Sequence, residues 1–353
     1  MSNALADADL RSLQAALADL DPDAPAVDAL ASLAERGLDQ LPLPGSGATW
    51  QRWRALATVA AFDLSLAKLY EGHTDALAIM AELGVGEVPQ GSTWGTWAAE
   101  APNRRAVVER LANGRLAVRG GKAWCSGAAG LSHGLLTAWF ADGRGPQLVR
   151  VAMAQPGVAV DAAAWRAVGM AGSASIDVRF SDAVNDVMGD VVGDEVGGVG
   201  DYLSRPGFWQ GGAGVAACWY GGATALGAAV HRAVVRAPAA QRSPLRLAAL
   251  GKIDVALQAT AALLRDAAVW IDAYPQADAS AIALRARLAA EDCARLVLDE
   301  AGRTLGAAAF CLDAHFARMA ADLPVFVRQS HAERDFAALG ERVAQQENDP
   351  WLL

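Results

Sequence analysis

The side chains best suited to acid–base chemistry lie near the C-terminus, between Ser330 and Glu333. Histidine as a residue type exchanges protons near neutral pH, so His331 is the first candidate catalytic acid or base, and the carboxylate of Glu333 is the second. A structural role is the alternative, because Ser330 followed by Glu333 fits a capping box at a helix start. His331 and Glu333 also match half of the zinc-deaminase pattern, but the sequence lacks the P-C-x-x-C that would complete it.

A further chemical pattern lies at Gly130 to Gly134, which matches the G-x-S-x-G sequence of serine hydrolases. That chemistry needs its serine, here Ser132, on a tight turn between a strand and a helix. The residues that follow, LLTAWFA, have the composition of a strand. A β-turn is therefore the preferred interpretation, and a hydrolase is disfavoured.

The composition restricts the class of protein. Thirty basic and thirty-nine acidic residues give a formal charge of -9, which argues against a nucleic-acid partner because phosphate binding needs clustered Lys and Arg. The four cysteines are far apart and form no C-x-x-C pair, so neither a disulfide scaffold nor a Cys-rich zinc site is expected. The N-terminal residues have no signal-peptide pattern, and a reduced, cytoplasmic location is predicted.

Residues 211–230 carry no charge and form a stretch long enough to span a bilayer. Their apolar character comes mostly from Gly and Ala, and no strong basic cluster flanks them. A helix buried on all sides, whose small residues let neighbouring backbones approach, is preferred over a membrane span. No membrane association is therefore expected.

The elements that must position the candidate residues fall into three zones. Between about residues 10 and 83, Ala and Leu recur at steps of three and four, which indicates helices. Between about residues 91 and 194, short runs rich in Val, Trp and Phe are separated by turn signals, which predicts strands and disfavours a βαβ dinucleotide fold. From about residue 198 the helical pattern returns in long segments.

The predicted fold class is therefore α+β. We expect an N-terminal helical domain (1–90), a middle antiparallel β barrel (91–195) and a C-terminal four-helix bundle (196–353).

Four motifs follow one another along these zones: GKAWCSG at 121–127, GMAGSASIDVRF at 169–180, SRP at 204–206 and LGKI at 250–253. Together with the order of the zones, they resemble the acyl-CoA dehydrogenase family of flavoproteins. The GKAWCSG motif is similar to the family's middle-domain strand, in which a Lys, an aromatic residue and a Thr or Ser alternate. The GMAGSASIDVRF motif is similar to the family's G-M-x-x-S stretch near the close of the β domain.

The resemblance implies an FAD between the β domain and the bundle, with an acyl thioester beside it. Trp124 would lie against the isoalloxazine ring, and Ser126 would offer its hydroxyl to the N5 edge. Thr96 and Trp97 belong to a stretch that resembles the family's T-E-P loop along the pyrimidine side of the flavin, although Ala99 stands where the family usually has Thr. Core packing is the alternative for both tryptophans.

The sequence departs from the family at the catalytic base and at the FAD loop. Many members carry a Glu-Gly pair near the chain end, and residues 321–335 contain none. Some relatives with this fold are flavin monooxygenases that place a histidine near here, which His331 would match. The family's Phe-Gly after the Gly-rich helix is also missing, although Arg242 could still pair with a pyrophosphate.

The resemblance implies an FAD-dependent oxidoreductase that acts on an acyl thioester, carried by CoA or an acyl-carrier protein, or on a related carbonyl compound. Two alternatives stay open: a flavin monooxygenase that uses His331, and a non-catalytic acyl- or partner-binding protein that has lost the base. The family usually forms dimers or tetramers through the bundle, so a homodimer or homotetramer is expected.

Overall fold

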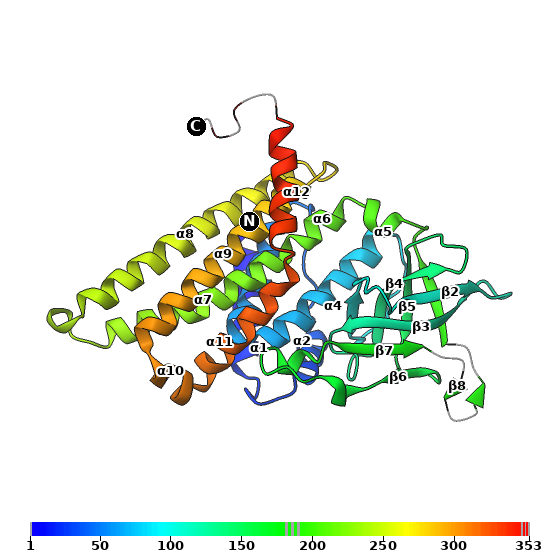
Figure 1. Cartoon of the computed structure of the whole chain (residues 1–353), viewed down its shortest axis with the longest axis horizontal. Helices are drawn as coiled ribbons and strands as arrows, with labels where there is room; N and C mark the ends of the chain where they lie inside the picture. The colour runs from blue at the N-terminus through cyan, green and yellow to red at the C-terminus, as the bar shows by residue number, and fades with distance from the viewer. Residues whose placement is uncertain are drawn as a thin grey trace. The chain divides into compact units, whose positions relative to one another are not determined.

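The structure is a computed structural model that describes residues 2–180, 183–184, 187–188, 191–346, 349 and 351. The α-helices are α1 (Ser2–Ala18), α2 (Ala26–Glu35), α3 (Thr49–Phe62), α4 (Leu64–Glu82), α5 (Asp201–Ser204), α6 (Gly207–Gly212), α7 (Gly214–Val235), α8 (Pro244–Ala273), α9 (Ser280–Leu305), α10 (Ala307–Leu312), α11 (Ala314–Phe326) and α12 (Glu333–Ala344) (Figure 1).

The strands are β1 (Trp94–Trp97), β2 (Ala106–Arg110), β3 (Leu116–Cys125), β4 (His133–Phe140), β5 (Gln147–Ala152), β6 (Val158–Val160), β7 (Ile176–Phe180), β8 (Ala183–Val184), β9 (Val187–Met188) and β10 (Val191–Val196). Short 3-10 turns are η1 (Ala162–Ala164), η2 (Ala171–Ser173), η3 (Ala239–Gln241) and η4 (Val327–Gln329). The order of helices, strands and helices confirms the predicted α+β class.

The chain divides into two compact units. Unit 1 contains Met1–Leu41, Lys68–Ala167 and Ala171–Phe208, and it combines the first helices with the strands. Unit 2 contains Pro42–Ala67, Val168–Met170 and Trp209–Leu353, and it combines α3 with the long C-terminal helices.

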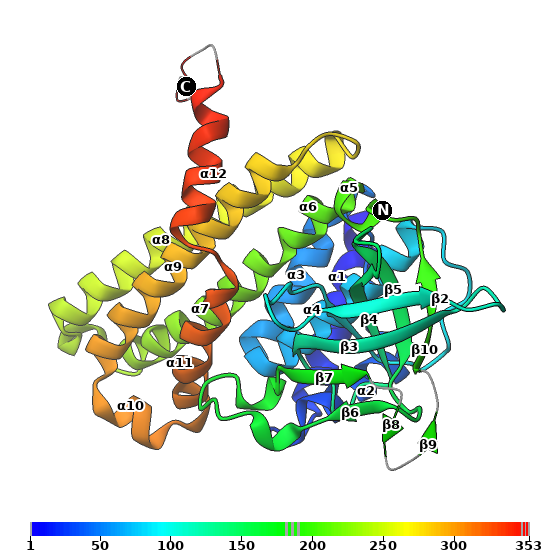
Figure 2. The same ribbon diagram turned by 45° about the vertical axis from the view of Figure 1, so that its right-hand side comes forward.

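The predicted barrel is present in unit 1, and five strands close it. β3 pairs with β2, β2 with β4, β4 with β5, β5 with β10, and β10 returns to β3 (Figure 2). β1 pairs with β4 outside this ring, and β7 and β6 extend from β3. The pairs are mostly antiparallel, as predicted, but β4 runs parallel to both β1 and β2.

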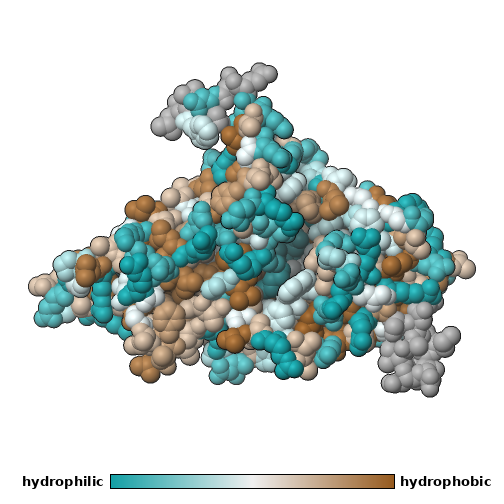
Figure 3. Space-filling model, viewed as in Figure 1, coloured by the Kyte–Doolittle hydropathy of each residue, from teal (hydrophilic) through white to brown (hydrophobic). Residues whose placement is uncertain are grey.

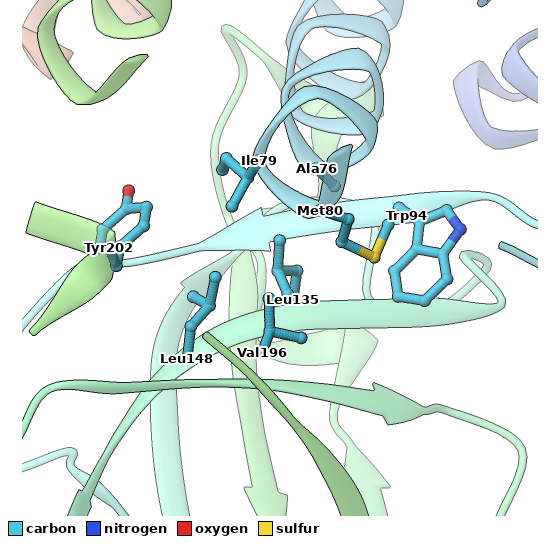
Figure 4. Close-up of a cluster of buried hydrophobic side chains, with 8 residues drawn as sticks. All are labelled: Ala76, Ile79, Met80, Trp94, Leu135, Leu148, Val196 and Tyr202. Atoms are coloured by element: carbon cyan, nitrogen blue, oxygen red, sulfur yellow. The ribbon is translucent and has the colours of Figure 1, made fainter. Parts of the chain in front are cut away.

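A cluster of buried hydrophobic side chains packs α4 against the barrel (Figure 4). Ala76, Ile79 and Met80 lie at helical spacing on one face of α4, which is the pattern of a helix that covers a sheet. The strands and α5 contribute Trp94, Leu135, Leu148, Val196 and Tyr202. Helix α4 therefore packs on residues from β1, β4, β5 and β10.

A buried histidine joins α4 to the start of β1. His73 accepts a hydrogen bond from Trp94 N at Nδ1, so Nε2 donates to Asp39 Oδ2 at 3.0 Å. Burial alone would raise the pKa of Asp39, but the hydrogen bond with His73 brings the pKa below its ordinary value. His73 is completely buried and serves as an anchor of the fold.

Helix α7 is the buried helix that residues 211–230 predicted. It packs against α3 in unit 2, and a Cβ built on Gly221 would lie 2.3 Å from the carbonyl oxygen of Ala57. Only glycine permits this approach of the two backbones. By length and composition, Gly207–Val235 and Pro244–Ala273 could cross a membrane, and 78% and 22% of their most apolar windows are buried within the protein.

Candidate functional site

Four non-glycine residues in the described part of the chain have positive φ angles: Trp124, Met170, Ala174 and Ala332. Such a backbone costs on the order of 1–3 kcal/mol per residue, persists only where the surroundings enforce it, and concentrates at functional sites. Trp124 lies in the GKAWCSG motif, Met170 and Ala174 lie in the GMAGSAS motif, and Ala332 follows His331. The strained backbone therefore falls in the segments that the sequence singled out.

Trp124 owes its conformation to a β-bulge. Between β3 and β7, Lys122 pairs with Val178 and Cys125 pairs with Ile176, so Ala123 and Trp124 together lie opposite Asp177. The additional residue breaks the alternation of side chains and increases the local bend. With a φ of 62°, Trp124 turns outward and is 61% exposed.

The outward face of Trp124 lines a hollow of about 590 Å³ in unit 1. This volume lies within the usual range for small-molecule and cofactor sites. The walls come from three stretches: 101–104 after β1, 164–167 after η1, and 175–177 at the start of β7. Trp165 stands nearly perpendicular to Trp124, with ring centroids 6.5 Å apart, and these two rings form an aromatic corner.

Serine hydroxyls lie beside this aromatic corner. Ser126 Oγ is 2.7 Å from Ser175 Oγ, which is 3.1 Å from Ser173 Oγ. Ser126 and Ser173 are buried, whereas Ser175 lines the hollow. Because a hydroxyl is both a donor and an acceptor, this chain of three can present a hydrogen bond to a ligand at Ser175, and Ser126, which is not among the residues that line the hollow, would act through Ser175.

Thr96 and Trp97 lie on β1 and are not among the residues that line the hollow. Thr96 Oγ1 donates to Gly72 O at 2.7 Å, which ties β1 to α4. Trp97 is 2% exposed and its Nε1 donates to Ser126 O at 3.1 Å. In this structure Trp97 supports the turn that carries Ser126.

An ion pair joins the buried Lys122 of β3 to Glu100, whose side chain is 37% exposed. Lys122 is 1% exposed, and its Nζ donates to Glu100 Oε1 at 2.8 Å. Burial lowers the pKa of Lys122. Burial would raise the pKa of Glu100, but the hydrogen bond from Lys122 lowers it below the ordinary value. Glu100 therefore stays ionised and bound to the ammonium at neutral pH.

The GMAGSAS motif begins in unit 2, where it contacts α11. A Cβ on Gly169 would lie 2.1 Å from the carbonyl oxygen of Ala321, so only glycine fits there. Met170 N donates to Asp322 Oδ1 at 2.5 Å. Asp322 is 3% exposed, and burial raises its pKa to about 6. This aspartate fixes the strained Met170 backbone.

The candidate acid–base residues lie in unit 2, between η4 and α12. His331 has a side chain that is 60% exposed, with Nδ1 3.5 Å from Asp335 Oδ1. Glu333 is the exposed first residue of α12. The capping box predicted between Ser330 and Glu333 is wrong. Ser330 Oγ accepts a hydrogen bond from Ala332 N, and the carboxylate that accepts from His331 N belongs to Asp335 and not to Glu333. The positive φ of Ala332 displaces the helix start and produces this change.

Arg242 lies in unit 2 at the end of η3 and is half-buried. Its Nε donates to Ala237 O at 3.3 Å, which leaves the rest of the guanidinium able to bind an anion. Over the described residues, no group of three or more His, Cys, Asp or Glu side chains could hold a metal ion.

Sequence reasoning did not identify Trp165, Ser175 or the role of Lys122. The signal for Ser175 was available, because it lies in the GMAGSAS motif, two residues after Ser173. Trp165 lies in an irregular stretch with no periodic pattern to place it.

No protein-family model and no curated protein matches the sequence. Solved structures nevertheless share its fold over nearly the whole chain. TdsC from Paenibacillus sp. A11-2, a dibenzothiophene monooxygenase solved with FMN and indole, has a TM-score of 0.75 at 17% identity and covers 98% of this chain and 97% of its own. KijD3, solved with FMN and a dTDP-linked sugar, has a TM-score of 0.74 at 19% identity and covers 97% and 93%.

A steroid ACAD variant also shares the fold, with a TM-score of 0.73 at 16% identity over 98% of this chain and 99% of its own. The chain therefore has the fold of the acyl-CoA dehydrogenases, as the sequence predicted. Of the structures named here, those of TdsC and KijD3 were solved with FMN.

Proposed function

We propose that the protein is a flavin-dependent oxidoreductase of the monooxygenase kind, with FMN as the preferred flavin. The strained and exposed Trp124, set in an aromatic corner over a hollow of cofactor size, is the observation that carries the proposal. A solvent-exposed Trp held at a cost in backbone energy is expected where a flat aromatic ligand covers it. The FMN in the TdsC and KijD3 structures supports this flavin over the FAD expected from sequence.

The residues of the hollow fit a flavin. Trp124 offers one face for stacking, and the Ser126–Ser175 pair offers hydroxyls to a polar ring edge. When bound, a flavin supplies redox chemistry, exchanging two electrons with an organic substrate or passing them to dioxygen. In a monooxygenase reaction one oxygen atom enters the substrate, the other leaves as water, and reduced flavin supplies the two electrons.

His331 is the proposed proton donor or acceptor. Its imidazole is exposed, and Asp335 Oδ1 lies close enough to orient the ring. Glu333, two residues further along the chain, is the second candidate. A dehydrogenase acting on an acyl-CoA or acyl-carrier thioester is the second candidate function, but the absence of a Glu-Gly pair in residues 321–335 disfavours it.

Flavin titration tests the proposal. We expect FMN to bind the wild type with its fluorescence quenched, and Trp124→Ala to weaken binding by about 10-fold or more, since stacked aromatic pairs contribute roughly 0.5–1.5 kcal/mol beyond the area they bury. Trp351→Ala is the matched control, because Trp351 is 79% exposed and lies outside the hollow. Equal weakening by both variants would contradict the assignment of Trp124.

Turnover then separates the candidate reactions. With bound flavin reduced anaerobically and then exposed to dioxygen, His331→Asn is expected to retain FMN and lose product formation. Bleaching of oxidised flavin by an acyl-CoA would instead support the dehydrogenase. Failure to bind either FMN or FAD would support the non-catalytic acyl- or partner-binding alternative.

The expected homodimer or homotetramer has support from one helix of unit 2. Leu245, Val255 and Val269 on α8 are 62% exposed or more, and Figure 3 shows hydrophobic side chains among the polar ones on the face drawn. Burying these side chains against a second copy would remove their apolar surface from water, which favours association. Light scattering on the purified protein would test the oligomer, and the cytoplasmic location remains a prediction.

A further inference from the structure

The conformation of Trp124 needs a restraint on each side of the bulge. On the C-terminal side, Cys125 is completely buried, and its Sγ donates to Lys122 O at 3.3 Å. On the N-terminal side, the restraint is Lys122 itself, two residues before Trp124 and almost completely buried. The strand is therefore fixed at both ends of the two-residue bulge, and only Trp124 faces outward.

Lys122 is held by all three hydrogen-bond donors of its ammonium. Nζ donates to Glu100 Oε1 at 2.8 Å, to Thr137 O at 2.9 Å and to Thr137 Oγ1 at 2.6 Å. An ammonium has three donors and no acceptor, so these bonds saturate it and fix its position. Such an arrangement anchors the strand and leaves no donor for a ligand.

Glu100 connects the anchor to a wall of the hollow. Besides Lys122, Oε1 accepts from Thr137 Oγ1 at 2.6 Å, and Oε2 accepts from Trp139 Nε1 at 3.1 Å. Glu100 immediately precedes residues 101–104, which line the hollow together with Trp124. One carboxylate therefore ties this wall to both β3 and β4.

We propose that Glu100, Lys122 and Thr137 form a clamp that holds Trp124 outward, so that Lys122 is a positioning residue for flavin binding. This inference rests on the proposed flavin site. The clamp acts through Trp124 and does not touch the flavin, which distinguishes it from a binding residue.

A double-mutant cycle tests the clamp. Lys122→Met keeps most of the length of the side chain and removes the ammonium, and we expect FMN binding to weaken by about 10-fold. Arg119→Met is the matched control on the same strand, because its ion pair with Glu109 is exposed, and a change below about 2-fold is expected. If Lys122 acts through Trp124, then Lys122→Met adds less than about 2-fold to the loss caused by Trp124→Ala. Additive losses would overturn the proposal.

A separate measurement does not depend on flavin. The difference in acrylamide-quenchable fluorescence between a protein and its Trp124→Phe counterpart reports the exposure of Trp124 alone. We expect this difference to fall in the Lys122→Met background and to persist in the Arg119→Met background. An unchanged difference in folded Lys122→Met would refute the clamp. A wild type that binds no FMN but shows the expected quenching would refute the flavin site and leave the clamp standing.

Glu100→Gln provides another route if Lys122→Met does not fold, as judged by circular dichroism. This change preserves shape and removes the charge, so the contact with Lys122 weakens while the packing stays. The same cycle with Trp124→Ala is expected to be non-additive, with a smaller loss of FMN affinity than Lys122→Met would give. Wild-type FMN affinity and quenching in Glu100→Gln would also reject the clamp.

Discussion

The burial of Asp322 predicts how the stability of the protein changes with pH. This buried carboxyl accepts a hydrogen bond from Met170 N, and its burial raises its pKa from 3.8 to about 6; the Met170 hydrogen bond and Arg318 oppose this rise and Asp63 adds to it. Because the folded-state pKa lies above the unfolded-state value, the folded protein binds more protons. The stability that Asp322 contributes is complete below about pH 3.8 and is lost as the pH rises to about 6.

Replacing Asp322 with Asn removes this pH dependence. The rise in pKa from 3.8 to about 6 corresponds to about 3 kcal/mol at pH 8, where the wild type carries the full penalty, and to about half of that at pH 5, where most of the folded carboxyl is protonated. The hydrogen bond from Met170 N remains, since an amide oxygen accepts it. The stability of Asp322→Asn relative to the wild type should therefore rise by about 1 kcal/mol from pH 5 to pH 8.

Urea unfolding at several pH values between 5 and 8, followed by circular dichroism, measures this difference. Asp299→Asn is the control, because Asp299 lies exposed on α9 and pairs only at the surface with Arg303, so a change below about 0.5 kcal/mol is expected at every pH. Stability curves for wild type and Asp322→Asn that run parallel across the pH range would show that burial does not perturb Asp322 as argued.

Two further predictions concern the motifs. Ser126→Ala and Ser175→Ala should each shift the absorption maximum of bound flavin, because the two hydroxyls bond to each other and Ser175 lines the hollow. Ser204→Ala, at an exposed serine, should leave the maximum unchanged. Spectra of the three FMN complexes check this, and an unaltered maximum in both site variants would remove the serines from the site. Gly169→Ala should destabilise the protein by about 2 kcal/mol or more in urea unfolding, because the added Cβ would meet the backbone of α11. A Cβ at Gly251 would have nothing within 4 Å, so Gly251→Ala should be neutral or slightly stabilising. Equal stability of the two variants would contradict the close approach at Gly169.

Local patterns predicted the elements well. The runs around β3, β4 and β5 carried their own signals of composition and turns, and the uncharged stretch at 211–230 became the buried α7 because small residues suit close helix packing. The parallel pairing of β4 with β1 and β2 was not predictable, since strand direction depends on the path of the whole sheet and not on any one strand's sequence.

The site shows the same division between local and non-local information. The GKAWCSG motif pointed to Trp124, but its outward turn arises from a register shift against β7, which lies about 50 residues later and is invisible in the motif itself. Trp97, like Trp124, is a tryptophan in a segment that resembles the family's flavin-binding motifs, yet the pairing of β1 directs it inward, where its Nε1 donates to Ser126 O. Ser330 has the sequence context of a helix cap, and only the backbone of Ala332 shows that Asp335 takes part instead.

The closure of the barrel has a consequence for how the protein is synthesised. β10 is the strand that joins β5 to residues 116–118 of β3, so neither edge is covered until residues 191–196 have left the ribosome. Open strand edges are templates for pairing with other chains, and contacts between distant residues form slowly. During synthesis the nascent chain therefore passes through an interval in which two edges are exposed at once, and the arrival of a single six-residue strand ends it.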